Sequence, residues 1–162
     1  MRALLAALLL AAPAAALADY DPFEDAPPSD ERRRLSVTAW GGELLGLTRS
    51  GRQDAAHLGG EVAWSFDALD VGVLGQAARL RPATSDWSPV ALLRLTERFE
   101  TRQGVEATFT LGIGAAREEA WKAWFQVALG VRVDLGPLFL AGELGSEQGD
   151  LFRLAAGLGA RF

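Results

Sequence analysis

Apolar residues occur at every second position along most of the chain after residue 34. In the longest run, the apolar positions are Trp121, Ala123, Phe125, Val127, Leu129, Val131, Val133 and Leu135. The last twelve residues repeat the pattern, with Phe152, Leu154, Ala156, Leu158, Ala160 and Phe162 on one face. Because successive side chains of a strand point to opposite faces, this period predicts strands with one apolar face and one polar or small-residue face.

Eight segments of this kind can be counted, approximately at residues 35–47, 57–66, 71–80, 89–99, 104–115, 121–135, 138–144 and 151–162. The connections after the second, fourth and sixth segments are short, and most of those after the first, third and fifth are longer. Short turns at one end and longer loops at the other are typical of outer-membrane barrels. The sequence therefore predicts an all-β fold, an eight-stranded antiparallel up-and-down transmembrane β-barrel over residues 35–162.

Within the first segment the alternation is interrupted at Gly41, Gly42 and Glu43. A bulge at such a point would exchange the two faces. The pattern alone does not fix the directions of Trp40 and Glu43.

The period does not say which face points outward, since a soluble barrel of the lipocalin kind alternates in the same way. The polar faces of the segments at residues 104–115 and 151–162 favour a membrane barrel, because they are rich in Thr, Gly and Ala, carry few charges and suit a narrow lumen. Aromatic residues on the apolar faces lie near strand ends, as expected at the two membrane–water interfaces. These predicted interface residues are Phe66, Phe99 and Phe162 at the turn end, and Trp121 and Phe152 at the loop end. Glu97 is the exception on this face, but it lies near the turn end, where the cost is roughly 0–1 kcal/mol.

The first 34 residues lack the alternation of the rest of the chain. Residues 1–18 hold one charge, a Leu- and Ala-rich run and a small-residue end, which predicts a signal peptide cleaved after Ala18. A membrane-anchoring helix is the alternative, although the run is short of the ~20 apolar residues of a span. Residues 19–34 form an acidic, proline-containing leader that ends in Arg32, Arg33 and Arg34. We interpret these arginines as the hydrated end of the first strand; a binding patch is the other possibility.

Composition narrows the function classes. The formal net charge is −5, and removing residues 1–18 with Arg2 makes it −5 − 1 = −6. An acidic chain argues against nucleic-acid binding. The chain has no cysteine, so it has neither a disulfide nor a lipid-modified cysteine.

A closing strand that ends on an aromatic residue, here Phe162, resembles the C-terminal strand of bacterial outer-membrane barrels. With its strand count and loop asymmetry, the chain resembles small barrels of the OmpA/OmpX type over residues 35–162. The resemblance implies an outer-membrane location with a periplasmic C-terminus, and contacts with outer-membrane lipids. It also implies that Phe162 is a signal read by the barrel-assembly machinery. We expect a monomer that acts as an envelope scaffold or a surface-interaction protein.

If the apolar faces point outward, the charged residues of the other faces point into the lumen. These residues are Glu61, Arg94, Glu106, Arg132, Glu143, Arg153 and Arg161. An eight-stranded lumen is only wide enough for side chains, so charges of both signs must pair there. Counting from the turn end places Glu61, Arg94 and Glu143 at similar depth.

Three roles for the lumen follow from this arrangement. The first is a salt-bridged plug, and the second is a gate that opens when ion pairs exchange. The third is a narrow channel or passive transporter for small or apolar solutes, compatible with lumen-facing Leu74, Trp124 and Phe139.

A lipid A-modifying enzyme is a remote alternative, because some eight-stranded barrels catalyse such reactions. The single histidine, His57, is predicted at the loop rim, where a polar surface role is usual. Glu61 lies four residues away, about 13 Å along a strand, beyond hydrogen-bond reach. Ser50 is in the adjacent loop, with nothing to hold it near His57. We therefore predict no catalytic residues, no cofactor and no metal site.

Overall fold

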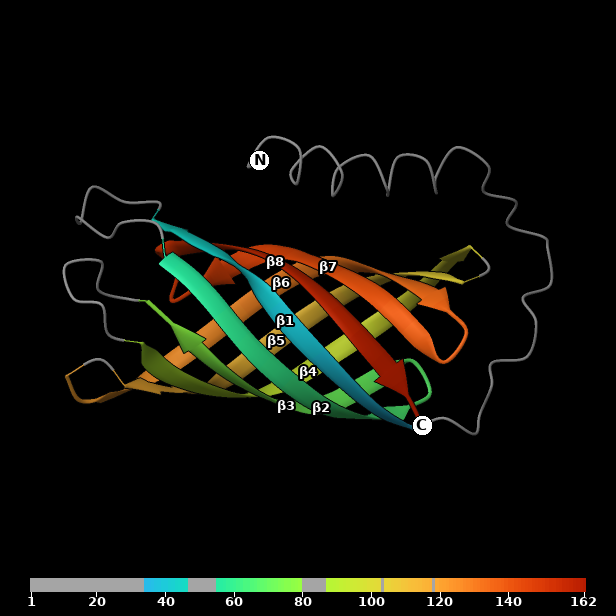
Figure 1. The fold of residues 1–162 in the computed structure, drawn as a ribbon, viewed down its shortest axis with the longest axis horizontal. Helices are drawn as coiled ribbons and strands as arrows, with labels where there is room; N and C mark the ends of the chain where they lie inside the picture. The colour runs from blue at the N-terminus through green and yellow to red at the C-terminus, as the bar shows by residue number, and fades with distance from the viewer. Residues whose placement is uncertain (1–33, 47–54, 80–86, 103, 118) are drawn as a thin grey trace.

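The computed structural model describes residues 34–46, 55–79, 87–102, 104–117 and 119–162. Eight strands follow one another along the chain and slant around a common axis (Figure 1). They are β1 (Leu35–Gly46), β2 (Ala55–Phe66), β3 (Leu69–Ala78), β4 (Ser88–Arg102), β5 (Val105–Arg117), β6 (Trp121–Leu135), β7 (Leu138–Glu147) and β8 (Leu151–Arg161). No helix of the described residues has the length and apolar content needed to cross a membrane.

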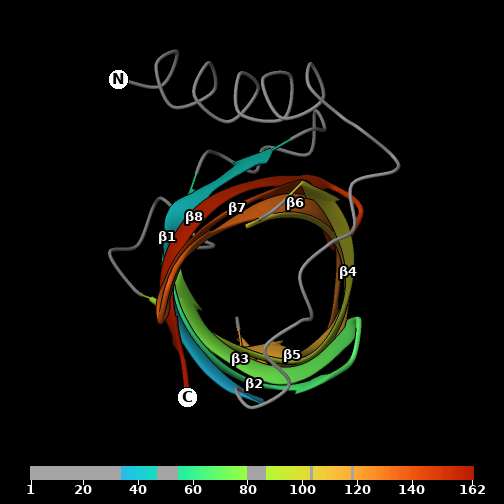
Figure 2. The same ribbon diagram turned by 90° about the vertical axis from the view of Figure 1, so that its right-hand side faces the viewer.

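Each strand pairs antiparallel with the next, and β8 pairs with β1 to close the barrel. Viewed along the axis, the strands form a complete ring (Figure 2). Two backbone hydrogen bonds join Leu35 to Phe162, at 3.3 and 2.8 Å, so the last residue completes the ring at the turn end. The predicted fold, an eight-stranded antiparallel up-and-down barrel, is confirmed.

Tight turns make two of the strands longer than predicted. The turn after β2 contains only Asp67 and Ala68, with Asp67 at φ 50°, so β3 begins at Leu69 rather than Val71. The turn after β7 has Gln148 and Gly149 at φ 55° and 74°. With positive φ at these two residues, the chain reverses within three residues, Gln148 to Asp150. Strand β7 therefore continues to Glu147, where the sequence predicted a loop from Gly145 to Gly149.

Strands β2, β4 and β5 also exceed their predicted bounds. β2 begins at Ala55, and β5 continues to Arg117. β4 continues to Arg102 with a register shift between Glu100 and Arg102, in the segment predicted as a turn. Residues 1–33, which contain the predicted signal peptide and nearly all of the leader, lie outside the described residues.

In strand β1, side chains continue to alternate between the inside and the outside of the barrel through Gly41 and Gly42. Its pairing with β2 runs without a shift from Leu35 to Leu44, so no bulge exchanges the faces. Trp40 and Leu44 are buried inside the barrel. Glu43 lies between Gly42 and Leu44 and therefore falls on the outer face. The directions that the pattern left open are set by simple alternation.

The two faces of the barrel have opposite character. Large apolar side chains cover the outside, and nearly all of them are about half exposed. The exposed group includes Val62, Trp64, Val73, Leu93, Leu95, Leu111, Ile113, Phe125, Val127, Leu129, Leu140 and Leu158. The buried group inside contains both apolar residues and fifteen polar or charged ones among the described residues. The outside is therefore the apolar face, and the lumen holds the charges.

Candidate functional site

An apolar cluster fills the loop half of the lumen. Its members are Trp40, Leu44, Ala55, Leu74, Ala78, Val90, Leu92, Ala116, Trp124, Leu151 and Ala155. Most of them come from the loop ends of their strands, since β1, β3, β5 and β7 end there and the other four begin there. Leu44, Leu74 and Leu92 are at most 1% exposed. The lumen is therefore polar only in part, and apolar side chains occupy it toward the loop end.

A group of buried charges lies against this cluster, and we call it the loop-side network: Glu61, Arg94, Glu143, Glu147 and Arg153. The Arg94 guanidinium lies between two carboxylates, 2.6 Å from Glu61 and in direct contact with Glu143. Arg153 lies 3.4 Å from Glu143 and 2.9 Å from Glu147. Glu143 thus joins the two arginines into one chain of ion pairs.

The loop-side network has three carboxylates for two guanidinium groups, and neutral donors add hydrogen bonds to two of these carboxylates. Glu147 accepts hydrogen bonds from Trp124 at 2.8 Å and from Gln126 at 3.0 Å. Trp40 donates to Glu61 at 2.9 Å. Buried carboxylates need such partners, because an unpaired charge out of water is very costly. The tryptophans therefore belong both to the apolar packing and to the polar network.

A second group of charges lies toward the turn end, and we call it the turn-side network: Asp70, Arg98, Glu106, Arg132, Asp134 and Arg161. Arg98 and Arg132 each contact both Asp70 and Glu106, at 2.9–3.5 Å. Arg161 contacts Glu106 at 2.9 Å and Asp134 at 2.8 Å. Three arginines are matched by three acids. Except for Asp70, these side chains are 11–27% exposed, so water reaches this half of the lumen.

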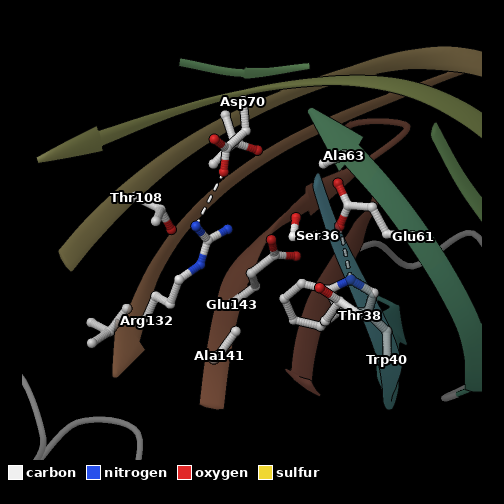
Figure 3. A pocket seen from close by; sticks show the side chains of 13 residues that line it. Ser36, Thr38, Trp40, Glu61, Ala63, Asp70, Thr108, Arg132, Ala141 and Glu143 are labelled. Carbon is white, nitrogen blue, oxygen red and sulfur yellow. Dashed lines mark hydrogen bonds and ion pairs between the residues drawn. The ribbon is translucent and has the colours of Figure 1, made fainter. Parts of the chain in front are cut away.

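A small cavity of about 20 Å³ separates the two networks. Figure 3 shows Arg132 reaching Asp70 on one side and Glu61 bonded to Trp40 on the other, with Glu143 between them. Hydroxyl groups of Ser36, Thr38, Thr96 and Thr108 complete its polar lining. A polar space of this size is sufficient for a single water molecule.

Two aromatic rings pack directly on cross-strand glycines inside the barrel. Phe139 pairs with Gly159 and Trp40 with Gly157, and a Cβ atom on either glycine would collide with the facing ring. Arginines also lie over these rings, with Arg132 4.7 Å from the Phe139 centroid and Arg94 5.5 Å from that of Trp40. The absence of a side chain at these glycines lets a large ring lie flat in a narrow lumen.

All seven charged residues predicted for the lumen lie there, and Arg94 brings Glu61 and Glu143 together as their common partner. The prediction omitted four partners: Asp70, Arg98, Asp134 and Glu147. Arg98 lies on the same face of its strand as Arg94, and Asp134 on the same face as Arg132. The alternation was therefore sufficient to predict that both point into the lumen. Asp70 and Glu147 were assigned to connections, and the tight turns place them in strands instead.

His57 corrects another expectation. The sequence predicted a polar surface position at the rim, but the side chain is fully buried, in the same half of the lumen as the apolar cluster. Its Nδ1 lies 3.5 Å from an Arg153 nitrogen, and no hydrogen bond joins it to Glu61 in the described part of the chain. Ser50 lies outside the described residues. Among the residues that the structure describes, no group of acids and histidines is placed to hold a metal ion.

The five predicted interface aromatics all lie on the outer face. Phe66, Phe99 and Phe162 are 48–65% exposed at the turn end, and Trp121 is 60% exposed at the loop end. Phe152 is partly exposed near the start of β8. Their contact with lipid, and the part of Phe162 in assembly, stay predictions.

No protein-family model matches the chain. A search of curated proteins also finds no match. Several solved structures are similar in fold, and two of them are outer-membrane barrels. One is the N-terminal β-barrel domain of OprF from Pseudomonas aeruginosa, with a TM-score of 0.61, 11% identity, and coverage of 80% of this chain and 98% of that one. The other is Neisserial surface protein A, NspA, with a TM-score of 0.53, 13% identity, and coverage of 79% and 96%. The fold is thus that of small bacterial outer-membrane barrels.

Proposed function

We propose that this chain is an integral outer-membrane protein with a plugged lumen, which acts as a non-enzymatic envelope scaffold or surface-interaction protein. The observation that carries the proposal is the reversal of faces, with large apolar side chains outside and ion-paired charges inside. An outer surface of this kind would aggregate in water, and in a bilayer it would face lipid. The fold similarity to outer-membrane barrels supports the same location.

In this proposal the turns after β2, β4 and β6 and the C-terminus face the periplasm, and the loop end faces outward. The aromatic residues at the two ends would lie at the membrane–water interfaces. The barrel-assembly machinery would recognise the closing strand that ends at Phe162. We expect a monomer whose main partners are outer-membrane lipids.

Fractionation of bacteria that express the full chain tests the proposal. The protein should appear in the outer-membrane fraction, resist extraction by carbonate, and change its gel mobility when heated, as folded barrels do. A soluble periplasmic protein would contradict the proposal and favour a soluble barrel with the same strand pattern.

A narrow channel is the second candidate, because the charged side chains in the turn half of the lumen are partly exposed and a small cavity lies between the two networks. The dry apolar cluster at the loop end opposes it, since a permeating solute would have to displace several buried side chains. An enzymatic role predicts altered lipid A acyl chains on expression. Mass spectrometry of lipid A that shows unchanged chains would count against it.

A further inference from the structure

Two pairs of arginine and tryptophan residues lie on the outer surface at the loop end. In the first pair, the Arg79 guanidinium lies 6.0 Å from the centroid of the Trp87 ring, within the range of a cation–π contact. Arg79 directly follows β3 and Trp87 directly precedes β4, where Ala78 and Ser88 are partners. The backbone N–H of Arg79 donates to Ala56 at 3.0 Å, which fixes the residue against β2.

The second pair is Arg117 and Trp121, which are cross-strand partners at the loop end of β5 and β6. Both side chains are exposed, and Trp121 is 60% exposed. They continue the outward positions of their strands, above Ile113 and Phe125. The second hairpin therefore repeats the arrangement of the first.

The two pairs lie on neighbouring hairpins at the loop end, because β4 pairs with β5 and Val90 is the partner of Ala116, the residue before Arg117. We call Arg79, Trp87, Arg117 and Trp121 the loop-end belt. Lys122 and Glu119 are also exposed in the second hairpin, and their charges cancel. The belt is therefore positive among the described residues. Near the turn end, by contrast, the outer face of β4 carries a negative charge, that of Glu97.

We infer that the loop-end belt binds phosphate groups of lipid headgroups in the outer leaflet, which goes beyond the proposed function and rests on its membrane orientation. Indole rings favour the level of the headgroups, and the exposed apolar side chains directly below would reach the acyl chains. At that level an arginine faces the phosphates, which its planar guanidinium binds through two parallel hydrogen bonds. The contact with Trp87 restricts the Arg79 side chain, which is exposed and therefore accessible to a headgroup.

Native mass spectrometry of the barrel, purified from outer membranes of cells expressing the full chain, can measure this binding. The probes are bisphosphorylated lipid A and the same lipid with its phosphates removed. The unmodified protein should retain the phosphorylated lipid preferentially, and each substitution, Arg79→Gln or Arg117→Gln, should weaken retention roughly fivefold. Arg34→Gln is the matched control, because it removes an exposed arginine at the turn end.

Equal retention of the two lipids by the unmodified protein would overturn the inference without any variant. Full retention by the Arg79→Gln, Arg117→Gln double variant, with its heat-dependent gel shift intact, would also overturn it. Displacement of the lipid by millimolar pyrophosphate would identify the ligand as free phosphate instead. A chain absent from the membrane fraction would overturn the proposed function together with the belt, whereas a membrane-inserted barrel without phosphate preference would overturn the belt alone.

Discussion

Arg153 and Arg161 lie on the same face of β8, eight residues apart, and each contacts two carboxylates, yet their surroundings differ. Arg153 is fully buried, with its guanidinium near Glu143 and Glu147 and close to the apolar cluster. Arg161 is 18% exposed, and its partner Asp134 is 27% exposed. The two distances to the nearest carboxylates are almost equal, 2.9 and 2.8 Å. The distance between the charged groups therefore does not by itself determine how much each ion pair contributes to the stability of the barrel.

The difference lies in the solvent. Apolar side chains exclude water from the loop half, so each charge there depends on its partners and on the neutral donors around it. In the turn half, water replaces a lost partner and screens the remaining charges. The loop half should consequently be sensitive to the removal of one charge, and the turn half tolerant of it.

Replacement of Arg94 should give the largest effect. Arg94→Gln leaves Glu61 and Glu143 buried without their shared cation, which should lower the free energy of unfolding by about 3–5 kcal/mol. Arg161→Gln, the matched change in the turn half, should cost less than about 1 kcal/mol. Urea unfolding in lipid vesicles measures both, and equal losses would contradict the distinction between the halves.

Steric packing in the turn half is tested separately by Gly159→Ala. The added Cβ meets the Phe139 ring, so we expect a loss of about 1–3 kcal/mol even though water reaches this region. Gly75→Ala is the control, since no atom lies within 4 Å of its added Cβ, and it should be nearly neutral. A neutral Gly159→Ala would show that the Phe139 ring moves freely and that the turn half is loosely packed.

Double-mutant cycles compare one ion pair from each half. For Glu147→Gln with Arg153→Gln, we expect a coupling energy of about 1–2 kcal/mol that changes little with salt. For Asp134→Asn with Arg161→Gln, the coupling should be about 0.5 kcal/mol and should fall as salt screens it. Similar couplings with similar salt dependence would mean that both pairs experience the same solvent.

The smallest effect should come from the outer surface. Glu97 is exposed on the outer face near the turn end of β4, opposite Leu69 and Phe109. In a bilayer, Glu97→Leu should stabilise the barrel by roughly 0–1 kcal/mol, because a carboxylate near the interface costs little. A loss of stability, measured by the same urea titration, would indicate that Glu97 has a polar partner there.

Alternation in the sequence was sufficient to predict the strand number, the closed fold and the direction of the seven charged residues. It could not predict which charges meet, because partners such as Gln76 and Glu147 are 71 residues apart and face each other only across the closed ring. Register and tilt of the whole barrel decide those contacts. Asp70 and Glu147 were missed because two-residue and three-residue turns extend the strands past the polar residues that resembled loops. His57 is buried inside a closed ring whose apolar cluster includes side chains from six other strands, and no local pattern contains that information.

Single-channel recording in a planar bilayer tests most directly whether the loop half of the lumen is closed. The sample is the barrel purified from outer membranes, with folding verified by its heat-dependent gel shift. Because the apolar cluster and the buried ion pairs of the described residues occupy the loop half of the lumen, the inserted protein should give a silent baseline. Reproducible conductance steps from folded barrels would contradict a plugged lumen and favour a channel or a gate.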